Sequence, residues 1–250
     1  MEQRKLPFVW ELNYKGVISH AVGTHHYLPN IESYVADSCR HLQGKSHLLT
    51  ETTEDQPWPE EVQKQFLAFT LSLEKLTVPE QEELARAIEA PLSVLRECPA
   101  IKFRDLLYKH SGYDRLDPLD GLLHFVAKNQ FGMQSYPLET VEEKLAIYKN
   151  VDMSLGLLRM LEEERRNPGY LKRQAREEID LFIQGKLPND ENTPPEYTVI
   201  NEKRNQIMVT SSLPYLSEPS AIGVGATHFV QKPTMLELWQ NEGIKVERIQ

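Results

Sequence analysis

The chain has 250 residues, of which 40% are hydrophobic and 26% are charged, and its formal net charge is −9. This length allows one large α/β domain or two small ones, and the composition excludes wholesale disorder. The acidic balance argues against a nucleic-acid-binding surface, because contacts to phosphates need a basic face. We therefore expect a folded protein with no nucleic-acid partner.

The first predicted elements form a β-hairpin. Apolar runs at 6–12 and 16–22 flank the segment from Asn13 to Gly16, which favours a turn. The second run leads into Gly23-Thr24-His25-His26, where a histidine follows a glycine by three residues. Glycine permits a tight turn at the end of a strand, so we predict that His26 projects beyond that end.

One helix and one further strand are predicted after this turn. Asn30 is suited to be an N-cap, and it precedes a pattern that predicts a helix over 31–42. Residues 46–51 then predict a short strand whose last residue, Glu51, is acidic. This strand would bring a carboxylate to a second strand end.

The pattern becomes helical from about residue 58 to residue 129. Apolar residues recur at steps of three and four over 62–76 and 84–95, and Pro91 predicts a kink in the second stripe. A last helix of this region is predicted over 119–129. We interpret the whole region as a large helical insertion between two parts of a central sheet.

A further strand and two helices are predicted next. Residues 131–139 contain a short strand that again ends at an acid, Glu139, and a long helix is predicted from Thr140 to Leu161. Another amphipathic helix covers 170–184. Residues 187–197 are rich in proline, asparagine and acids, and predict a mobile loop.

The last part of the chain repeats the histidine motif. A short helical piece near 204–208 precedes a strand over 221–224, and Gly225-Ala226-Thr227-His228 follows that strand directly. A helix that ends at Gly243 and a half-exposed strand over 244–249 complete the prediction. Three capping boxes mark helix starts: Thr77–Glu80, Thr140–Glu143 and Thr234–Glu237.

Two imidazoles and two carboxylates are thus predicted at strand ends, where open α/β sheets hold ligands: His26, His228, Glu51 and Glu139. A single histidine after a strand is more commonly a surface residue, but the repeated motif favours a shared site. These nitrogen and oxygen donors suit zinc, manganese, iron or cobalt alike. A metal held there would polarise a carbonyl and activate water, and one carboxylate would be left as a general base. His25 is a secondary candidate.

No targeting or anchoring segment is apparent in the chain. Cys39 and Cys98 match no zinc spacing and are expected to be thiols. The first residues lead into no apolar signal core, and no run approaches the ~20 apolar residues of a membrane helix. We expect a cytoplasmic protein with no membrane span, unless a leader was removed. The oligomeric state is not predicted.

Several motifs together resemble the TraB/GumN/TIKI family, which is related to the erythromycin esterase and ChaN-like proteins. They occur in the family's order and cover nearly the whole chain, from about residue 6 to residue 249. In chain order they are Phe8-Val9-Trp10-Glu11, Gly23 to His26 with Pro29, His47-Leu48-Leu49-Thr50-Glu51, Asp120-x-x-Leu123-x-x-x-Ala127-Lys128, Leu138-Glu139-Thr140, Arg204-Asn205-x-x-Met208, and Ile222 to His228 with Gly243.

The resemblance implies one α/β domain over residues 1–250, with a mixed central sheet built from two related halves. It also implies metal-dependent peptidase activity, as in the TIKI members, with manganese or cobalt favoured and zinc as a third option. His26, His228 and Glu51 would then hold the metal or act in catalysis, followed by Glu139. Arg204 and Asn205, with His25 as the secondary candidate, would orient the substrate.

Three hypotheses follow from these observations. The first is a metal-dependent hydrolase of the TIKI type that acts on a peptide or on a small amide or ester. The second is a non-catalytic module that uses the same pocket to capture a signalling peptide, a metal or a haem-like ligand. The third is an erythromycin-esterase-like hydrolase in which a histidine acts as general base without a metal.

Overall fold

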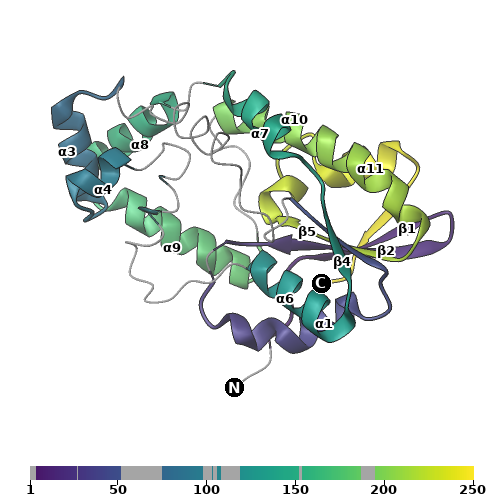
Figure 1. Ribbon diagram of the computed structural model, residues 1–250. Helices are drawn as coiled ribbons and strands as arrows, with labels where there is room; N and C mark the ends of the chain where they lie inside the picture. The colour runs from purple at the N-terminus through teal and green to yellow at the C-terminus, as the bar shows by residue number, and fades with distance from the viewer. Residues whose placement is uncertain are drawn as a thin grey trace.

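A mixed six-stranded sheet forms the centre of the molecule (Figure 1). The computed structural model describes residues 4–26, 28–51, 75–97, 103, 106–107, 119–151, 154–186 and 195–250, and within them the strand order is β4-β3-β5-β2-β1-β6. β2, β5, β3 and β4 are parallel, whereas β1 pairs antiparallel with both β2 and β6. The predicted α/β fold with a mixed central sheet is confirmed. The strands are β1 (Val9–Tyr14), β2 (Val17–Thr24), β3 (His47–Thr50), β4 (Gln134–Pro137), β5 (Ser220–Gly225) and β6 (Lys245–Arg248).

Helices cover both faces of this sheet. In Figure 1, α1 (Val35–Leu42) and α6 (Leu119–Phe131) lie on one face, and α10 (Pro195–Ser212) and α11 (Met235–Asn241) lie on the other. All six residues of β5 are buried, as expected for a central parallel strand with helices on both sides. The carboxyl ends of the parallel strands are therefore fixed by packing from above and below.

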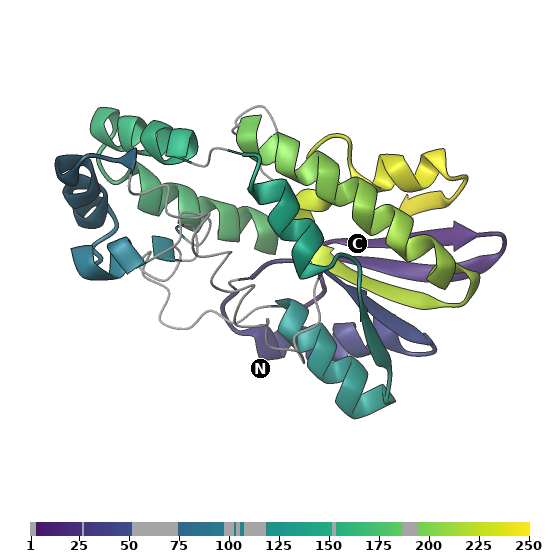
Figure 2. The same ribbon diagram turned by 45° about the horizontal axis from the view of Figure 1, so that its top comes forward.

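A group of helices extends to one side of the sheet (Figure 2). It contains α3 (Val78–Ala87), α4 (Leu92–Glu97), α8 (Ser154–Arg166) and α9 (Tyr170–Ile183), while α7 (Val141–Tyr148) packs against α10. The break before α4 falls at the predicted kink. Residues 52–74 and most of 98–118 lie outside the described part of the chain, including nearly all of the predicted stripe over 62–76. The single domain with an insertion at 58–129 stays a prediction.

Local sequence signals account for many element boundaries. Lys15 and Gly16 have φ of 53° and 88°, the left-handed conformation that a two-residue hairpin turn requires, and Asn13 Oδ1 accepts a hydrogen bond from the Gly16 N–H at 3.0 Å. All three capping boxes occur as predicted, before α3, α7 and α11. The hairpin matters for the site because β2 leads directly to the first histidine turn.

Two helix predictions are wrong. The long helix from Thr140 to Leu161 is two helices, α7 and α8, with Lys149 to Val151 outside both. The short piece near 204–208 belongs to α10, an 18-residue helix. α10 was hidden because its buried side mixes apolar residues with polar ones, so no apolar stripe marks it; the buried polar residues are Glu196, Asn201, Arg204, Asn205 and Ser212.

Two smaller predictions also need correction. Asn30 adopts the left-handed conformation with no capping hydrogen bond, and residues Ile31–Tyr34 form a 3-10 turn before α1 begins. Residues 195–197 of the predicted loop are the first turn of α10, and the rest of that loop lies outside the described residues. Within the described ranges, no helix is long and apolar enough to cross a membrane.

Candidate functional site

The two histidine turns lie side by side. β2 and β5 are adjacent parallel strands, with Thr24 opposite Gly225, so both turns leave the sheet at the same edge. The backbones come so close that a Cβ added at Gly23 would lie 3.2 Å from the Cβ of Ala226. Segments two hundred residues apart therefore meet at one place, and glycine permits this close approach.

The two acids arrive from the next two strands of the same sheet. β3 pairs with β5, and Glu51 follows β3 directly; β4 pairs with β3, and Glu139 follows β4 by two residues. The Glu139 N–H donates to the Glu51 carbonyl oxygen at 3.3 Å, which extends the pairing past the strands. The carboxyl ends of four parallel strands thus deliver two histidines and two glutamates, at the position where open α/β sheets hold ligands.

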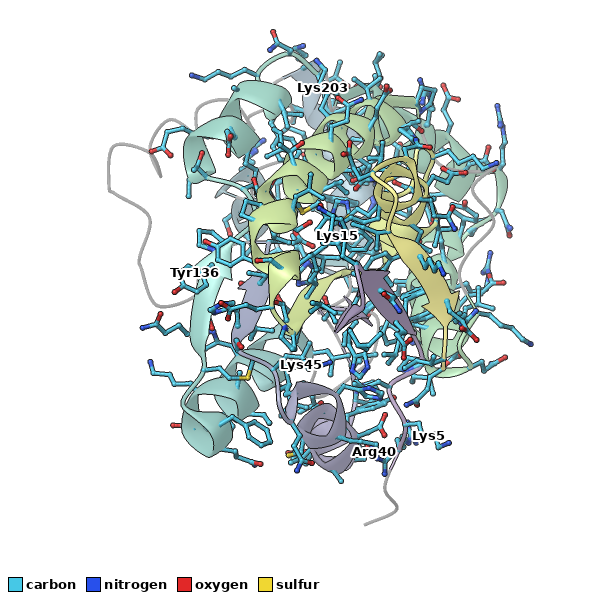
Figure 3. All side chains as sticks on the ribbon, turned by 90° about the vertical axis from the view of Figure 1, so that its right-hand side faces the viewer. Lys5, Lys15, Arg40, Lys45, Tyr136 and Lys203 are labelled. Carbon is cyan, nitrogen blue, oxygen red and sulfur yellow. The ribbon has the colours of Figure 1, made fainter. Side chains whose placement is uncertain are left out.

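Arg204, on α10, forms hydrogen bonds with both acids. It lies on the inner face of α10, whereas its neighbour Lys203 points outward (Figure 3). Arg204 Nε donates to both carboxylate oxygens of Glu139, at 3.1 and 2.9 Å, and Nη2 donates to Glu139 and to Glu51 Oε2, the latter at 2.6 Å. The guanidinium is 7% exposed and the Glu139 side chain 0%. Such a desolvated, bidentate pair fixes the positions of both partners.

Glu51 directs its second oxygen toward the second histidine turn. Oε1 accepts a hydrogen bond from the Gly225 N–H at 2.7 Å and lies 3.6 Å from His228 Nε2. Burial by itself would raise the pKa of Glu51, but the cation of Arg204, followed by His228, holds that pKa well below its usual value. Glu51 is therefore a carboxylate at neutral pH, and at 14% exposure its side chain reaches solvent where Glu139 does not.

Asn205 sets the tautomer of His228. The Asn205 amide nitrogen donates to the Pro233 carbonyl at 2.8 Å, so its oxygen faces His228 Nδ1 at 2.6 Å. Nδ1 must therefore carry the proton, and Nε2 presents a lone pair to Glu51. Burial, with a contribution from Arg204, lowers the pKa of His228 to about 3, so the ring is neutral. Asn205 is itself 0% exposed, which favours positioning His228 over the predicted substrate contact.

His26 lies at the open side of the cluster. Its side chain is 54% exposed, and Nδ1 lies 3.4 Å from Asp120 Oδ2 at the start of α6. His26 contributes to lowering the pKa of both Glu51 and His228, so it lies within electrostatic range of them. His25 turns elsewhere, with its ring centroid 5.2 Å from that of Phe182 on α9. The structure thus groups His26, but not the ring of His25, with the acids.

A sequence model of the TraB/PrgY/gumN family matches residues 8–248. The chain belongs to this family. The resemblance seen in the separate motifs is thereby confirmed over essentially the whole sequence. Searches of curated proteins and of solved structures found no match.

In this TraB/PrgY/gumN chain, two residues beside the acids escaped the sequence analysis. Lys144 and Tyr148 lie one turn apart on α7, and Lys144 Nζ is 3.7 Å from Glu139 Oε1. Burial, then Arg204, lowers the pKa of Lys144, and burial raises the pKa of Tyr148 to about 12. Lys144 follows Thr140 by four residues, and Tyr148 follows Lys144 by four. This spacing is ordinary for any helix, so the sequence carried no signal for the two residues.

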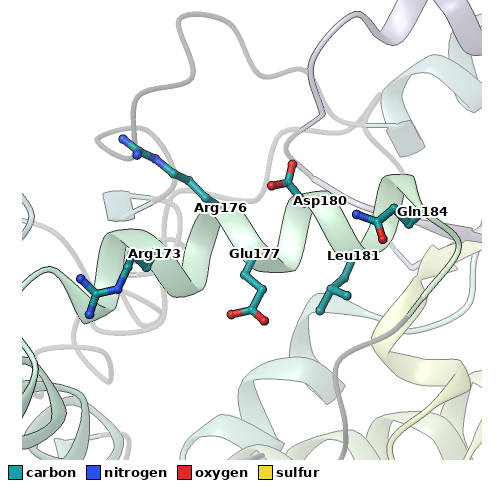
Figure 4. Close-up of a pocket in the computed structure, with 6 residues that line it drawn as sticks. All are labelled: Arg173, Arg176, Glu177, Asp180, Leu181 and Gln184. Atoms are coloured by element: carbon teal, nitrogen blue, oxygen red, sulfur yellow. The ribbon is translucent and has the colours of Figure 1, made fainter.

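No group of three or more His, Cys, Asp or Glu side chains forms a complete metal centre within the described residues. What the site presents is a two-donor arrangement, His228 Nε2 and Glu51 Oε1, with His26 nearby. A separate groove runs along α9 (Figure 4) and shares no residue with this cluster; it is lined by Arg173, Arg176, Glu177, Asp180, Leu181 and Gln184. The strand-end cluster is therefore the candidate site of this family member.

Proposed function

We propose that the chain is a metal-dependent hydrolase of the TIKI type, which cleaves a peptide or a small amide or ester. The observation that carries this proposal is the contact between His228 Nε2 and Glu51 Oε1, at 3.6 Å. Membership of the TraB/PrgY/gumN family supports it but does not specify a reaction. The substrate and the cytoplasmic location expected from the sequence stay predictions.

The two atoms of this contact suit a cation between or beside them. His228 Nε2 carries a lone pair, because Nδ1 donates to Asn205, and Glu51 is ionised, so two acceptors face each other without a proton of their own. Neutral imidazole and carboxylate are the protonation states that metal binding requires. Nitrogen and oxygen donors of this kind fit manganese, cobalt or zinc.

His228, Glu51 and His26 would hold the ion. A bound divalent cation supplies polarisation of the scissile carbonyl and a lowered pKa for water. Asn205 orients His228, and Glu51 keeps its carboxylate at the open side of the cluster, where it is the acid that reaches solvent. Glu139 is bound on both oxygens by Arg204, so we assign it the role of fixing Arg204 rather than that of general base. Lys144 adds a positive charge that suits a developing oxyanion.

The metal-independent hypothesis cannot use His228 as its base. A general-base histidine works best when its pKa lies near the working pH, and burial lowers the pKa of His228 to about 3. That hypothesis therefore depends on His26, and turnover that needs no metal but is lost in His26→Ala would support it. The binding-module hypothesis needs the same cluster without turnover, so activity separates it from a hydrolase. It remains the second candidate, because the buried Arg204 network by itself requires no catalysis.

The test is metal analysis of protein purified without chelator, followed by hydrolysis of a mixed peptide library with and without added manganese. We expect one ion per chain and turnover that depends on it, and we expect His228→Ala and Glu51→Gln to lose both. Glu83→Gln, a carboxylate paired with Arg165 in the side group of helices, is the control that should keep both. Metal without turnover supports the binding module, and turnover without metal contradicts the proposal.

A further inference from the structure

The first turn of α6 is attached to the first histidine turn. The Leu119 N–H donates to the His25 carbonyl oxygen at 3.0 Å, and the next residue, Asp120, places Oδ2 3.4 Å from His26 Nδ1. The Asp120 side chain is 27% exposed, against 54% for His26, so the carboxylate is the more buried partner of the contact. The contact therefore joins a buried helix start to the exposed histidine of the candidate site.

A comparable arrangement, with a shorter contact, occurs at the other histidine. His228 Nδ1 faces Asn205 Oδ1 at 2.6 Å, and His26 Nδ1 faces Asp120 Oδ2. In each case an oxygen from a helix lies at the δ nitrogen and leaves Nε2 to face elsewhere. A partner at one ring nitrogen determines the tautomer of a neutral histidine and the direction in which the other nitrogen accepts.

A purely structural role for Asp120, as a cap of α6, does not explain the positions of its two carboxylate oxygens. An acid in the first turn of a helix is favoured by the helix dipole, and it commonly accepts a backbone N–H. Asp120 Oδ1 is buried and has no hydrogen-bond partner in the described part of the chain, so this oxygen does not cap α6. A buried carboxylate oxygen without a partner is costly, and such groups are kept where they serve a site.

We infer that Asp120 is a positioning residue that accepts the Nδ1 proton of His26 and leaves Nε2 as the acceptor, as Asn205 does for His228. Both imidazoles then offer the same nitrogen to the shared site. The effect on metal affinity rests on the proposed function, whereas the tautomer of His26 does not. A bound cation makes the Nδ1 proton more acidic, which strengthens its hydrogen bond to Asp120.

The first test is the tautomer of His26 in metal-free protein, measured from 15N chemical shifts at a pH of about 8, where a histidine with an ordinary pKa is neutral. We expect the proton on Nδ1 in the wild type and in Asp120→Asn, whose amide oxygen replaces the carboxylate oxygen. In Asp120→Leu we expect the proton to move to Nε2. An Nε2 proton in the folded wild type, or an unchanged tautomer in Asp120→Leu, overturns the inference.

The second test is the affinity for Mn²⁺ alone. Asp120→Leu should weaken it about 10- to 100-fold, the range found for partners of metal-bound histidines. Asp180→Asn, at an exposed aspartate on α9, removes one negative charge elsewhere and should leave the affinity unchanged. If the wild type shows the Nδ1 tautomer but binds none of Mn²⁺, Co²⁺ and Zn²⁺, the proposed function fails and the assignment of Asp120 stands. If Mn²⁺ binds equally to wild type and Asp120→Leu, the positioning role fails alone.

Discussion

Arg204 is the buried cation that pairs with both acids of the candidate site. Burial by itself would lower the pKa of Arg204, but Glu51 and Glu139 raise it well above its usual value, so the guanidinium is a permanent cation. It is also the cation that holds the pKa of Glu51 well below its usual value, and it donates hydrogen bonds to the buried Glu139. Removal of one member of such a buried set leaves uncompensated charge, which costs more than the set contributes in its intact form.

Arg204→Met should therefore destabilise the fold by about 3–5 kcal/mol. The measurement is urea unfolding at neutral pH. Lys203→Met is the matched control, because Lys203 is the next residue of α10 and faces outward; its effect should stay within about 0.5 kcal/mol. Equal stability of the two variants would show that the Arg204 network contributes nothing beyond an exposed charge.

His228 predicts a specific dependence of stability on pH. Its pKa falls from 6.5 to about 3 on folding, so between these values the unfolded state binds a proton that the folded state excludes. The free energy of unfolding should then decrease as the pH falls from about 6.5, by up to about 1.4 kcal/mol per pH unit from this residue. Glu51, whose pKa is lowered from 4.5, adds to the loss only at lower pH.

His228→Asn tests this dependence, because its amide can still donate to Asn205 while it does not titrate. Urea unfolding of both proteins at pH values between about 6.5 and 5 isolates the histidine window. The variant should show the shallower decline with pH. His20, with a pKa lowered to about 4, contributes equally in both proteins and cancels from the difference. Parallel curves would contradict the buried, neutral state of His228.

At the scale of elements, the two turn glycines have different tasks. Neither Gly23 nor Gly225 has a positive φ, so alanine meets no backbone strain at either position. A Cβ at Gly23 would lie 2.8 Å from the Cβ of Phe8 and 3.2 Å from that of Ala226 in the other turn, whereas a Cβ at Gly225 would lie 3.0 Å from Glu51 Oε1. The first glycine thus serves packing, and the second leaves room for the carboxylate.

Gly23→Ala should therefore lower stability by about 1–3 kcal/mol, as overpacking does in cores. Gly225→Ala should have the smaller effect on stability but should displace Glu51 and weaken Mn²⁺ binding. Urea unfolding and Mn²⁺ titration of both variants separate the two effects. The opposite pattern, with Gly225→Ala the less stable and Gly23→Ala the weaker binder, would contradict these assignments.

Elements were predictable where one local signal decided them. The capping boxes at Thr77, Thr140 and Thr234 mark real helix starts, and the turn at Lys15-Gly16 marks the hairpin. α10 was not predictable, because its buried side carries polar residues that tertiary contacts satisfy, and no apolar stripe marks the helix in the sequence. Arg204 and Asn205 lie in the middle of α10 and face the site, whereas the sequence alone placed them in a short helical piece.

At the scale of the whole molecule, the order of motifs indicated which segments meet. Strand-end positions were assigned to His26, His228, Glu51 and Glu139 from the sequence, and the sheet order β4-β3-β5-β2 brings all four to one edge. The different environments of the two acids were not predictable, since no local sequence signal shows that Glu139 is enclosed by Arg204 while Glu51 stays partly exposed. Contacts between distant segments decide that difference.

The central claim is that both histidine turns serve one cation. Its most direct test is a double-mutant cycle on Co²⁺ affinity, followed by visible absorption, in wild type, His26→Ala, His228→Ala and the double variant. We expect one Co²⁺ per chain, weaker binding in each single variant, and an effect of the double variant that differs from the sum of the singles, as expected for residues that share one ligand. Unchanged affinity in either single variant, or strictly additive losses, would contradict it.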